Sequence, residues 1–184
     1  MRLFVGGVRS GKSALAQQWV ESHSAGTPGC LLLLAPCQVQ DAGMAARVAA
    51  HQASRGPEWR VCEEPLDPLR GLESALSAPG PGARPGPCAV LLDCVSMWVA
   101  NVQATGLDVP AIAERATRLA AGLRATGLPT ALVTAEVGLG LVPMNEVGRQ
   151  YIDMLGTANQ ILARACDTVV FVTCGQPLAV KGSL

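Results

Sequence analysis

Short runs of apolar residues recur along the chain at intervals that suit buried β-strands. Five runs stand out, at residues 3–5, 30–34, 89–92, 130–133 and 168–172. Most are almost continuously apolar, which is typical of strands covered on both faces in a parallel sheet. Helical patterns separate the runs and would supply the crossovers between parallel strands. The pattern predicts an α/β fold with three layers and a mostly parallel central sheet.

The polar positions between these runs indicate where helices and loops begin and end. One helix is expected to open at Asp108, with Pro110 just inside it, and to close at Gly127. The segment 77–87 is rich in Pro and Gly and is expected to be an exposed loop. The sequence on either side of that loop is too short to form a hydrophobic core of its own, so residues 1–184 are expected to form a single domain. Further helices are expected over residues 14–23, 43–54 and 145–165.

The composition favours small-molecule partners. The chain has 184 residues, 49% of them apolar, and its 14 basic residues balance its 14 acidic residues. Such a chain can bury one substantial core and lacks the charge excess that marks binding to nucleic acid or anionic membranes. No apolar run approaches the ~20 residues needed to span a bilayer, and the first predicted strand leaves no room for a signal peptide. We therefore expect a cytoplasmic protein with no nucleic-acid partner and no membrane span.

The seven cysteines and two histidines do not form a metal-binding pattern. The cysteine count is odd and no pair is spaced as Cys-x-x-Cys, so the thiols are expected to be reduced and mostly buried. Any metal is expected to be Mg²⁺ carried with a nucleotide.

A complete P-loop lies between the first predicted strand and the first predicted helix. Its glycines let backbone N–H groups face phosphates, the Lys12 ammonium reaches the outer phosphates, and the Ser13 hydroxyl binds Mg²⁺. Lys12 is one of only two lysines in the chain. A turn that merely joins strand to helix is the alternative, but the strand, loop and helix order favours a nucleoside triphosphate site. The residues concerned are Gly6, Gly7, Val8, Arg9, Ser10, Gly11, Lys12 and Ser13.

Asp93 directly follows the third apolar run. A carboxylate at the C-terminal end of a buried strand is where a P-loop protein holds the acid that binds Mg²⁺ beside the phosphates. The alternative is an aspartate that caps the following turn. The P-loop context favours the metal role.

His51 would lie between two arginines if residues 43–54 form a helix. Arg47, His51 and Arg55 follow one another at four-residue intervals, which places them on one helix face. Two neighbouring cations favour the neutral, nucleophilic imidazole, and the same arginines could hold a phosphate. On spacing alone, the alternative is a solvated polar face.

Taken together, these motifs resemble the bifunctional adenosylcobinamide kinase/adenosylcobinamide-phosphate guanylyltransferases of cobalamin biosynthesis. A P-loop alone is shared with many kinases, whereas this ordered set of blocks is specific. The resemblance implies a RecA-like P-loop NTPase fold. The matching blocks lie at residues 6–13, 41–48, 51–55, 59, 63–65, 92–101, 136–143, 148–149, 153–160 and 177–181.

The resemblance implies a transferase with two successive reactions. The aminopropanol hydroxyl of adenosylcobinamide first takes the γ-phosphoryl group of ATP or GTP. GTP then guanylylates His51 with release of pyrophosphate, and the GMP passes to adenosylcobinamide phosphate to give adenosylcobinamide-GDP. The resemblance also implies a homotrimer.

The same resemblance assigns roles to individual residues. His51 and Lys12 would be catalytic, and Ser13 and Asp93 would hold Mg²⁺. Arg55 would steady the α-phosphate. The rest of the nucleotide site would consist of the P-loop together with Ala35, Pro36, Cys37, Glu63 and Asp93.

The chain departs from the family pattern at three places. Ala35-Pro36-Cys37 stands where the family has Ala-Thr-Ala or Ala-Thr-Ser, which removes a hydroxyl and a backbone N–H from the nucleotide site. Gly43 replaces a glutamate, and Ala135 replaces an asparagine. Two other functions remain open at this point: a P-loop kinase without nucleotidyl transfer, and a non-enzymatic nucleotide-dependent switch.

Overall fold

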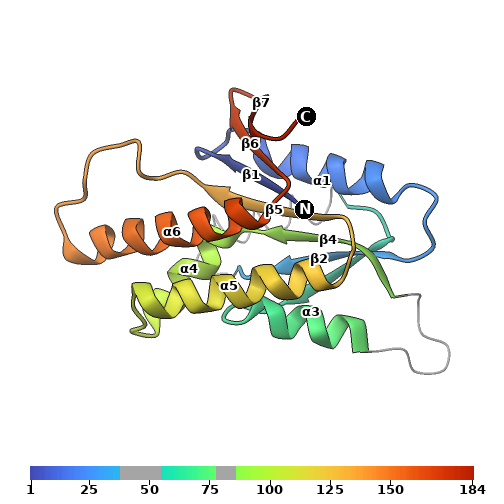
Figure 1. Ribbon diagram of the computed structural model, residues 1–184, viewed down its shortest axis with the longest axis horizontal. Helices are drawn as coiled ribbons and strands as arrows, with labels where there is room; N and C mark the ends of the chain where they lie inside the picture. Colours follow the sequence, from blue (N-terminus) through green and yellow to red (C-terminus); the bar gives the residue numbers. More distant parts are fainter. Residues whose placement is uncertain (38–54, 78–85) are drawn as a thin grey trace.

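A seven-stranded sheet forms the centre of the molecule in the computed structural model, which describes residues 1–37, 55–77 and 86–184 (Figure 1). The strand order is β3-β2-β4-β5-β1-β6-β7, and every neighbouring pair is parallel except β6 and β7. This confirms the predicted α/β fold with a mostly parallel sheet. The strands are β1 Arg2–Gly6, β2 Cys30–Ala35, β3 Trp59–Glu63, β4 Pro87–Asp93, β5 Thr130–Ala135, β6 Thr168–Thr173 and β7 Gln176–Lys181.

Helices cover both faces of the sheet and complete the three layers. In Figure 1, α1 lies on one face, and α3, α4, α5 and α6 lie on the other. None of the helices in the described part of the chain is long and apolar enough to cross a membrane. Their bounds are α1 Lys12–Ser24, α3 Pro68–Ser77, α4 Val95–Ala104, α5 Val109–Ala125 and α6 Glu146–Ala165.

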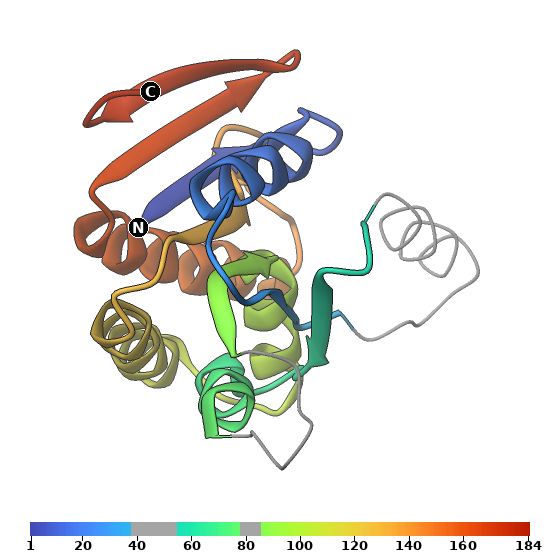
Figure 2. The same cartoon turned by 90° about the vertical axis from the view of Figure 1, so that its right-hand side faces the viewer.

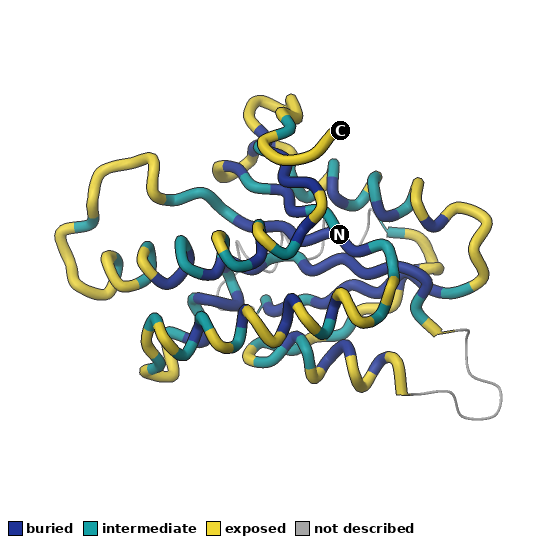
Figure 3. The backbone as a smooth tube through the Cα atoms, in the orientation of Figure 1, coloured by how far each residue is buried: buried dark blue, intermediate teal, exposed yellow. Residues whose placement is uncertain are grey.

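Alternate residues of the central strands supply two separate cores, one on each face. In β2, Leu32 and Leu34 pack toward α3–α6, whereas Leu31 and Leu33 pack toward α1. The same alternation occurs in β4 and β5. Burial on both faces explains why the sequence of these strands is apolar throughout rather than at every second position. Figure 3 shows the buried strands running through the middle of the molecule.

Two predicted helix starts are confirmed, whereas α1 begins two residues earlier and ends one residue later than the predicted helix over 14–23. The Asp108 side chain accepts a hydrogen bond from the Ala111 backbone N–H at the start of α5. Asn145 accepts from Gly148 N–H at the start of α6 in the same way. These caps satisfy backbone donors that have no partner inside the helix. The predicted helix over 43–54 lies outside the described residues.

Two strands, β3 and β7, and two helices, α3 and α4, were absent from the sequence prediction. The strands form the two edges of the sheet, as Figure 2 shows. Both contain polar residues among the apolar ones, and β7 contains Pro177, which an edge strand tolerates because one of its sides pairs with no other strand. The predicted loop at 77–87 was also one residue too long at each end, since α3 includes Ser77 and β4 begins at Pro87.

All seven cysteines are free thiols in the structure. Three are buried, three are half-buried, and Cys174 is exposed. The expectation that most are buried was therefore only partly right. The exposed thiol belongs to the turn between β6 and β7, a hairpin that the sequence pattern did not predict.

Candidate nucleotide-binding site

Five of the parallel strands end at one edge of the sheet and bring together residues that are distant in the sequence. The strand register pairs Ala35 with Glu63 and Gly6 with Ala135. It pairs Asp93 with Val133, two residues before the end of β5. Glu63, Ala35, Asp93, Ala135 and Gly6 therefore follow one another along this edge. Ligands of open α/β sheets bind outside the carboxyl ends of the strands. This edge is the candidate nucleotide site.

The P-loop connects β1 to α1 at this edge, as the motif requires. Gly6 ends β1, and a Cβ there would lie 2.3 Å from the Val172 backbone oxygen, so only glycine fits. Gly11 precedes α1 with φ +93°, a conformation that favours glycine. Lys12 Nζ lies 3.0 Å from the Gly7 oxygen, so the ammonium group is folded back over the loop. The lysine and the helix N-terminus together offer positive charge to phosphates.

Ser13 and Asp93 meet beside the P-loop. Ser13 Oγ donates to Asp93 Oδ1 over 3.4 Å, although the two residues lie 80 positions apart. A hydroxyl and a carboxylate are oxygen ligands of the kind that Mg²⁺ prefers. The donor set therefore fits the predicted metal role of these two residues.

The turn between β6 and β7 packs against the P-loop. Gly175 N–H donates to the Ser10 backbone oxygen over 2.9 Å. A Cβ on Gly11 would lie 3.3 Å from Gly175 Cα, so the two loops are in close contact. Sequence reasoning missed this contact, because the only signal was an unexplained glycine after β6.

Arg55 lies in the segment that leads into β3. Burial lowers the pKa of Arg55, while the carboxylates of Asp93 and Glu21 act in the opposite direction. Its guanidinium lies 5.5 Å from the centre of the Trp59 ring. Trp59 Nε1 in turn donates to Glu21 Oε1 over 3.2 Å. The tryptophan is thus held by a hydrogen bond and provides a surface against which the guanidinium can rest.

Cys37 lies near two carboxylates of the same edge. Burial raises the pKa of its thiol, and Asp93 and then Glu63 raise it further. Register pairs Ala35 with Glu63, so the Ala35–Cys37 segment begins beside Glu63 at this edge. His51 lies outside the described residues.

Asn101 of α4 ties two loops at this edge together. Its Nδ2 atom donates to the Pro36 oxygen over 2.7 Å and to the Pro65 oxygen over 3.1 Å, and the residue is only 7% exposed. Pro36 follows β2, and Pro65 follows β3. The side chain therefore fixes the ends of both strands relative to α4.

Replacing Asn101 with leucine is expected to destabilise the protein and to weaken nucleotide binding. The buried carbonyl group of Pro36 and the half-buried one of Pro65 would lose a donor, which costs about 1–3 kcal/mol of unfolding free energy. The KM for nucleotide should rise because the Pro36 segment would no longer be held. Urea unfolding and steady-state kinetics measure both effects. Gln103→Leu on the same helix, whose side chain contacts the start of α6 instead, should leave the nucleotide KM unchanged. An unchanged KM in Asn101→Leu would contradict this positioning role.

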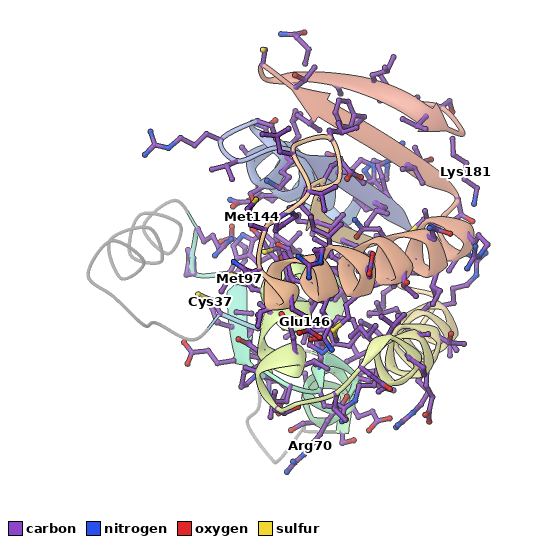
Figure 4. The ribbon with its side chains drawn as sticks, turned by 90° about the vertical axis from the view of Figure 1, so that its left-hand side faces the viewer. Cys37, Arg70, Met97, Met144, Glu146 and Lys181 are labelled. Carbon is purple, nitrogen blue, oxygen red and sulfur yellow. The ribbon has the colours of Figure 1, made fainter. Side chains whose placement is uncertain are left out.

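The second lysine of the chain has a structural contact rather than a place at the site. Lys181 Nζ donates to the backbone oxygens of Ala163, Arg164 and Cys166, at 3.0, 3.0 and 2.5 Å. Figure 4 shows Lys181 beside the end of α6. A cation there satisfies terminal carbonyl groups and complements the helix dipole.

Lys181→Met is therefore expected to lower the unfolding free energy by about 1–2 kcal/mol without affecting turnover per folded molecule. Lys181→Arg, which keeps the charge and the donors, should recover part of the loss. Urea unfolding measures the difference. Equal stability of the wild-type and methionine proteins would show that these hydrogen bonds contribute nothing.

A P-loop between a strand and a helix, with an acid at the end of a nearby strand of the same parallel sheet, defines a P-loop NTPase. The chain belongs to the cobinamide kinase / cobinamide phosphate guanyltransferase family, whose model matches residues 2–180.

Two curated relatives span almost the whole chain. It is 34% identical to the bifunctional adenosylcobalamin biosynthesis protein CobP of Pseudomonas aeruginosa, with 98% of this chain and 96% of the relative covered. It is 33% identical to the bifunctional adenosylcobalamin biosynthesis protein CobU of Salmonella typhimurium, with 98% and 99% covered. Among solved structures, an ATPase domain matches 92% of this chain and 68% of that chain, with a TM-score of 0.49 and 11% identity.

Proposed function

We propose that this protein phosphorylates the aminopropanol hydroxyl of adenosylcobinamide with ATP or GTP, and then transfers GMP from GTP to adenosylcobinamide phosphate through a guanylylated His51. The product is adenosylcobinamide-GDP. The observation that carries this proposal is the meeting of the P-loop with Asp93 at the carboxyl edge of the sheet. The family match over residues 2–180 supports the choice of substrates.

In the phosphorylation step, Lys12 leaves the Gly7 oxygen and contacts the β- and γ-phosphates. The P-loop N–H groups hold the same phosphates. Ser13 and Asp93 would hold Mg²⁺, which neutralises phosphate charge when bound. The hydroxyl oxygen of the acceptor forms a bond to the γ-phosphorus as the bond to the leaving nucleoside diphosphate breaks.

In the guanylylation step, a neutral imidazole nitrogen of His51 attacks the α-phosphorus of GTP, and pyrophosphate leaves. The electrostatic influence of Asp93 on Arg55 supports a contact between this guanidinium and the α-phosphate. The remaining contacts to the nucleotide come from the Ala35–Cys37 segment and Glu63. A phosphate oxygen of the acceptor then takes the GMP from His51.

The remaining expectations are part of the same proposal. Residues 1–184 form one catalytic domain, and the family resemblance supports a cytoplasmic homotrimer. Sedimentation velocity would test the trimer.

Isotopically labelled nucleotides test the function directly. With adenosylcobinamide as acceptor, γ-labelled ATP should give labelled adenosylcobinamide phosphate, and α-labelled GTP should then label adenosylcobinamide-GDP. Transfer of the γ-label without transfer of the α-label would indicate a simple kinase. If neither label moves, the protein is not this enzyme, and a nucleotide-dependent switch becomes the better account.

A further inference from the structure

Glu136 lies directly beside the P-loop and is the first residue of the block at 136–143. It follows the last residue of β5, and its backbone N–H donates to the Gly6 oxygen over 3.4 Å. Because β5 lies between β4 and β1, Glu136 stands between Asp93 and the start of the P-loop along the sheet edge.

The end of β5 is held firmly from α6. Asn159 Oδ1 accepts from Thr134 Oγ1 over 2.7 Å, and Asn159 Nδ2 donates to the Ala135 oxygen over 3.1 Å. One carboxylate oxygen of Glu136, Oε1, accepts from Gly138 N–H over 2.7 Å. These bonds fix both the backbone and the side chain of Glu136, which is half-buried.

The proposed reactions differ in their need for a proton acceptor. Phosphorylation uses a hydroxyl group, whose proton must leave as the new O–P bond forms. Guanylylation uses a neutral imidazole nitrogen that carries a lone pair, and the last transfer uses a phosphate oxygen that is already anionic. Neither of those two nucleophilic atoms has to lose a proton.

The other acids that end strands at this edge are poorly suited to that task. Asp93 hydrogen-bonds to Ser13 and fits the metal role. Glu63 belongs to β3, the outermost strand on that side of the sheet, which lies three positions away from β5. Glu136 is the acid that adjoins the loop where the γ-phosphate is expected. A carboxylate beside the phosphate loop can receive the proton of an acceptor hydroxyl as that hydroxyl oxygen bonds to the phosphorus.

We propose that Glu136 is the general base of the phosphorylation step, an inference that rests on the proposed function. The hydroxyl proton passes to a carboxylate oxygen of Glu136 as the acceptor oxygen bonds to the γ-phosphorus. The bond from the γ-phosphorus to the bridging oxygen breaks, and the nucleoside diphosphate leaves with that electron pair.

The test compares Glu136→Gln with the wild-type protein in separate assays of the two reactions. Glutamine keeps the shape and the acceptor for Gly138 N–H but cannot take a proton. The kcat for phosphorylation should fall about a hundredfold or more, since general-base catalysis contributes roughly 10²–10⁴-fold. The nucleotide KM should change little. Guanylylation by GTP, and GMP transfer to supplied adenosylcobinamide phosphate, should proceed at wild-type rates.

Glu146→Gln is the matched control, because Glu146 is an exposed acid at the start of α6, at the other end of the same connecting segment (Figure 4). It should keep both activities. Equal losses of both reactions in Glu136→Gln, or unchanged phosphorylation, would overturn the assignment. Failure of the wild-type protein to phosphorylate adenosylcobinamide would instead overturn the proposed function, and this inference with it.

Discussion

Lys12→Ala is expected to reduce both phosphorylation and guanylylation about a hundredfold or more, the size of loss seen when a group that stabilises transition-state charge is removed. The ammonium group lies at the P-loop, 3.0 Å from the Gly7 oxygen, and the other lysine of the chain caps α6 instead. Within the chain, no second lysine can replace it. The β- and γ-phosphates carry developing charge when the γ-group is transferred and also when pyrophosphate leaves.

Initial rates with γ-labelled ATP and α-labelled GTP measure the two losses separately. Lys12→Arg keeps a positive charge but changes its shape, so it should lose less than alanine in both assays. Loss of one reaction with the other intact would mean that the two steps do not share the P-loop lysine.

His51→Ala is expected to abolish guanylylation and to leave most of the phosphorylation activity. Removal of a nucleophile that acts with its neighbours costs about 10³-fold or more. Phosphorylation uses no covalent bond to histidine, so its kcat should stay within about tenfold of wild type. The α-label retained on protein after GTP treatment, and the γ-label transferred to adenosylcobinamide, are the two measurements.

His23→Ala is the control for this variant. His23 is the other histidine of the chain and lies in the last turn of α1, where Nδ1 is 2.9 Å from the Trp19 oxygen and the ring stacks against Trp19. It should keep both reactions. Equal loss of phosphorylation and guanylylation in His51→Ala would undo the separation of roles.

The interior of the fold could be predicted well because the central strands are buried on both faces. Their continuous apolar runs leave little ambiguity, and Asp108 and Asn145 mark helix starts with side chains that do cap them. The edge strands were missed because an edge strand is half solvated and needs no apolar run. Tertiary pairing with β2 and β6, rather than local pattern, makes β3 and β7 strands.

The candidate site was predictable where a motif determines local geometry. The P-loop carries its own turn, and Asp93 follows a strand that is recognisable from its composition. The contacts from Asn101 to Pro36 and from Gly175 to Ser10 depend on which loops meet after folding. Glu136 needed the strand order, because only the placement of β5 beside β1 brings it to the P-loop.

Peptide mapping of the wild-type protein after incubation with GTP tests the central claim most directly, namely that this P-loop site transfers GMP to His51. The predicted result is one GMP per chain on the peptide that contains His51, bound by a link that is labile in acid and stable in alkali. The same treatment of Lys12→Ala should give little adduct. GMP on another residue, or adenosylcobinamide-GDP formed by a wild-type protein that never carries GMP, would contradict the claim.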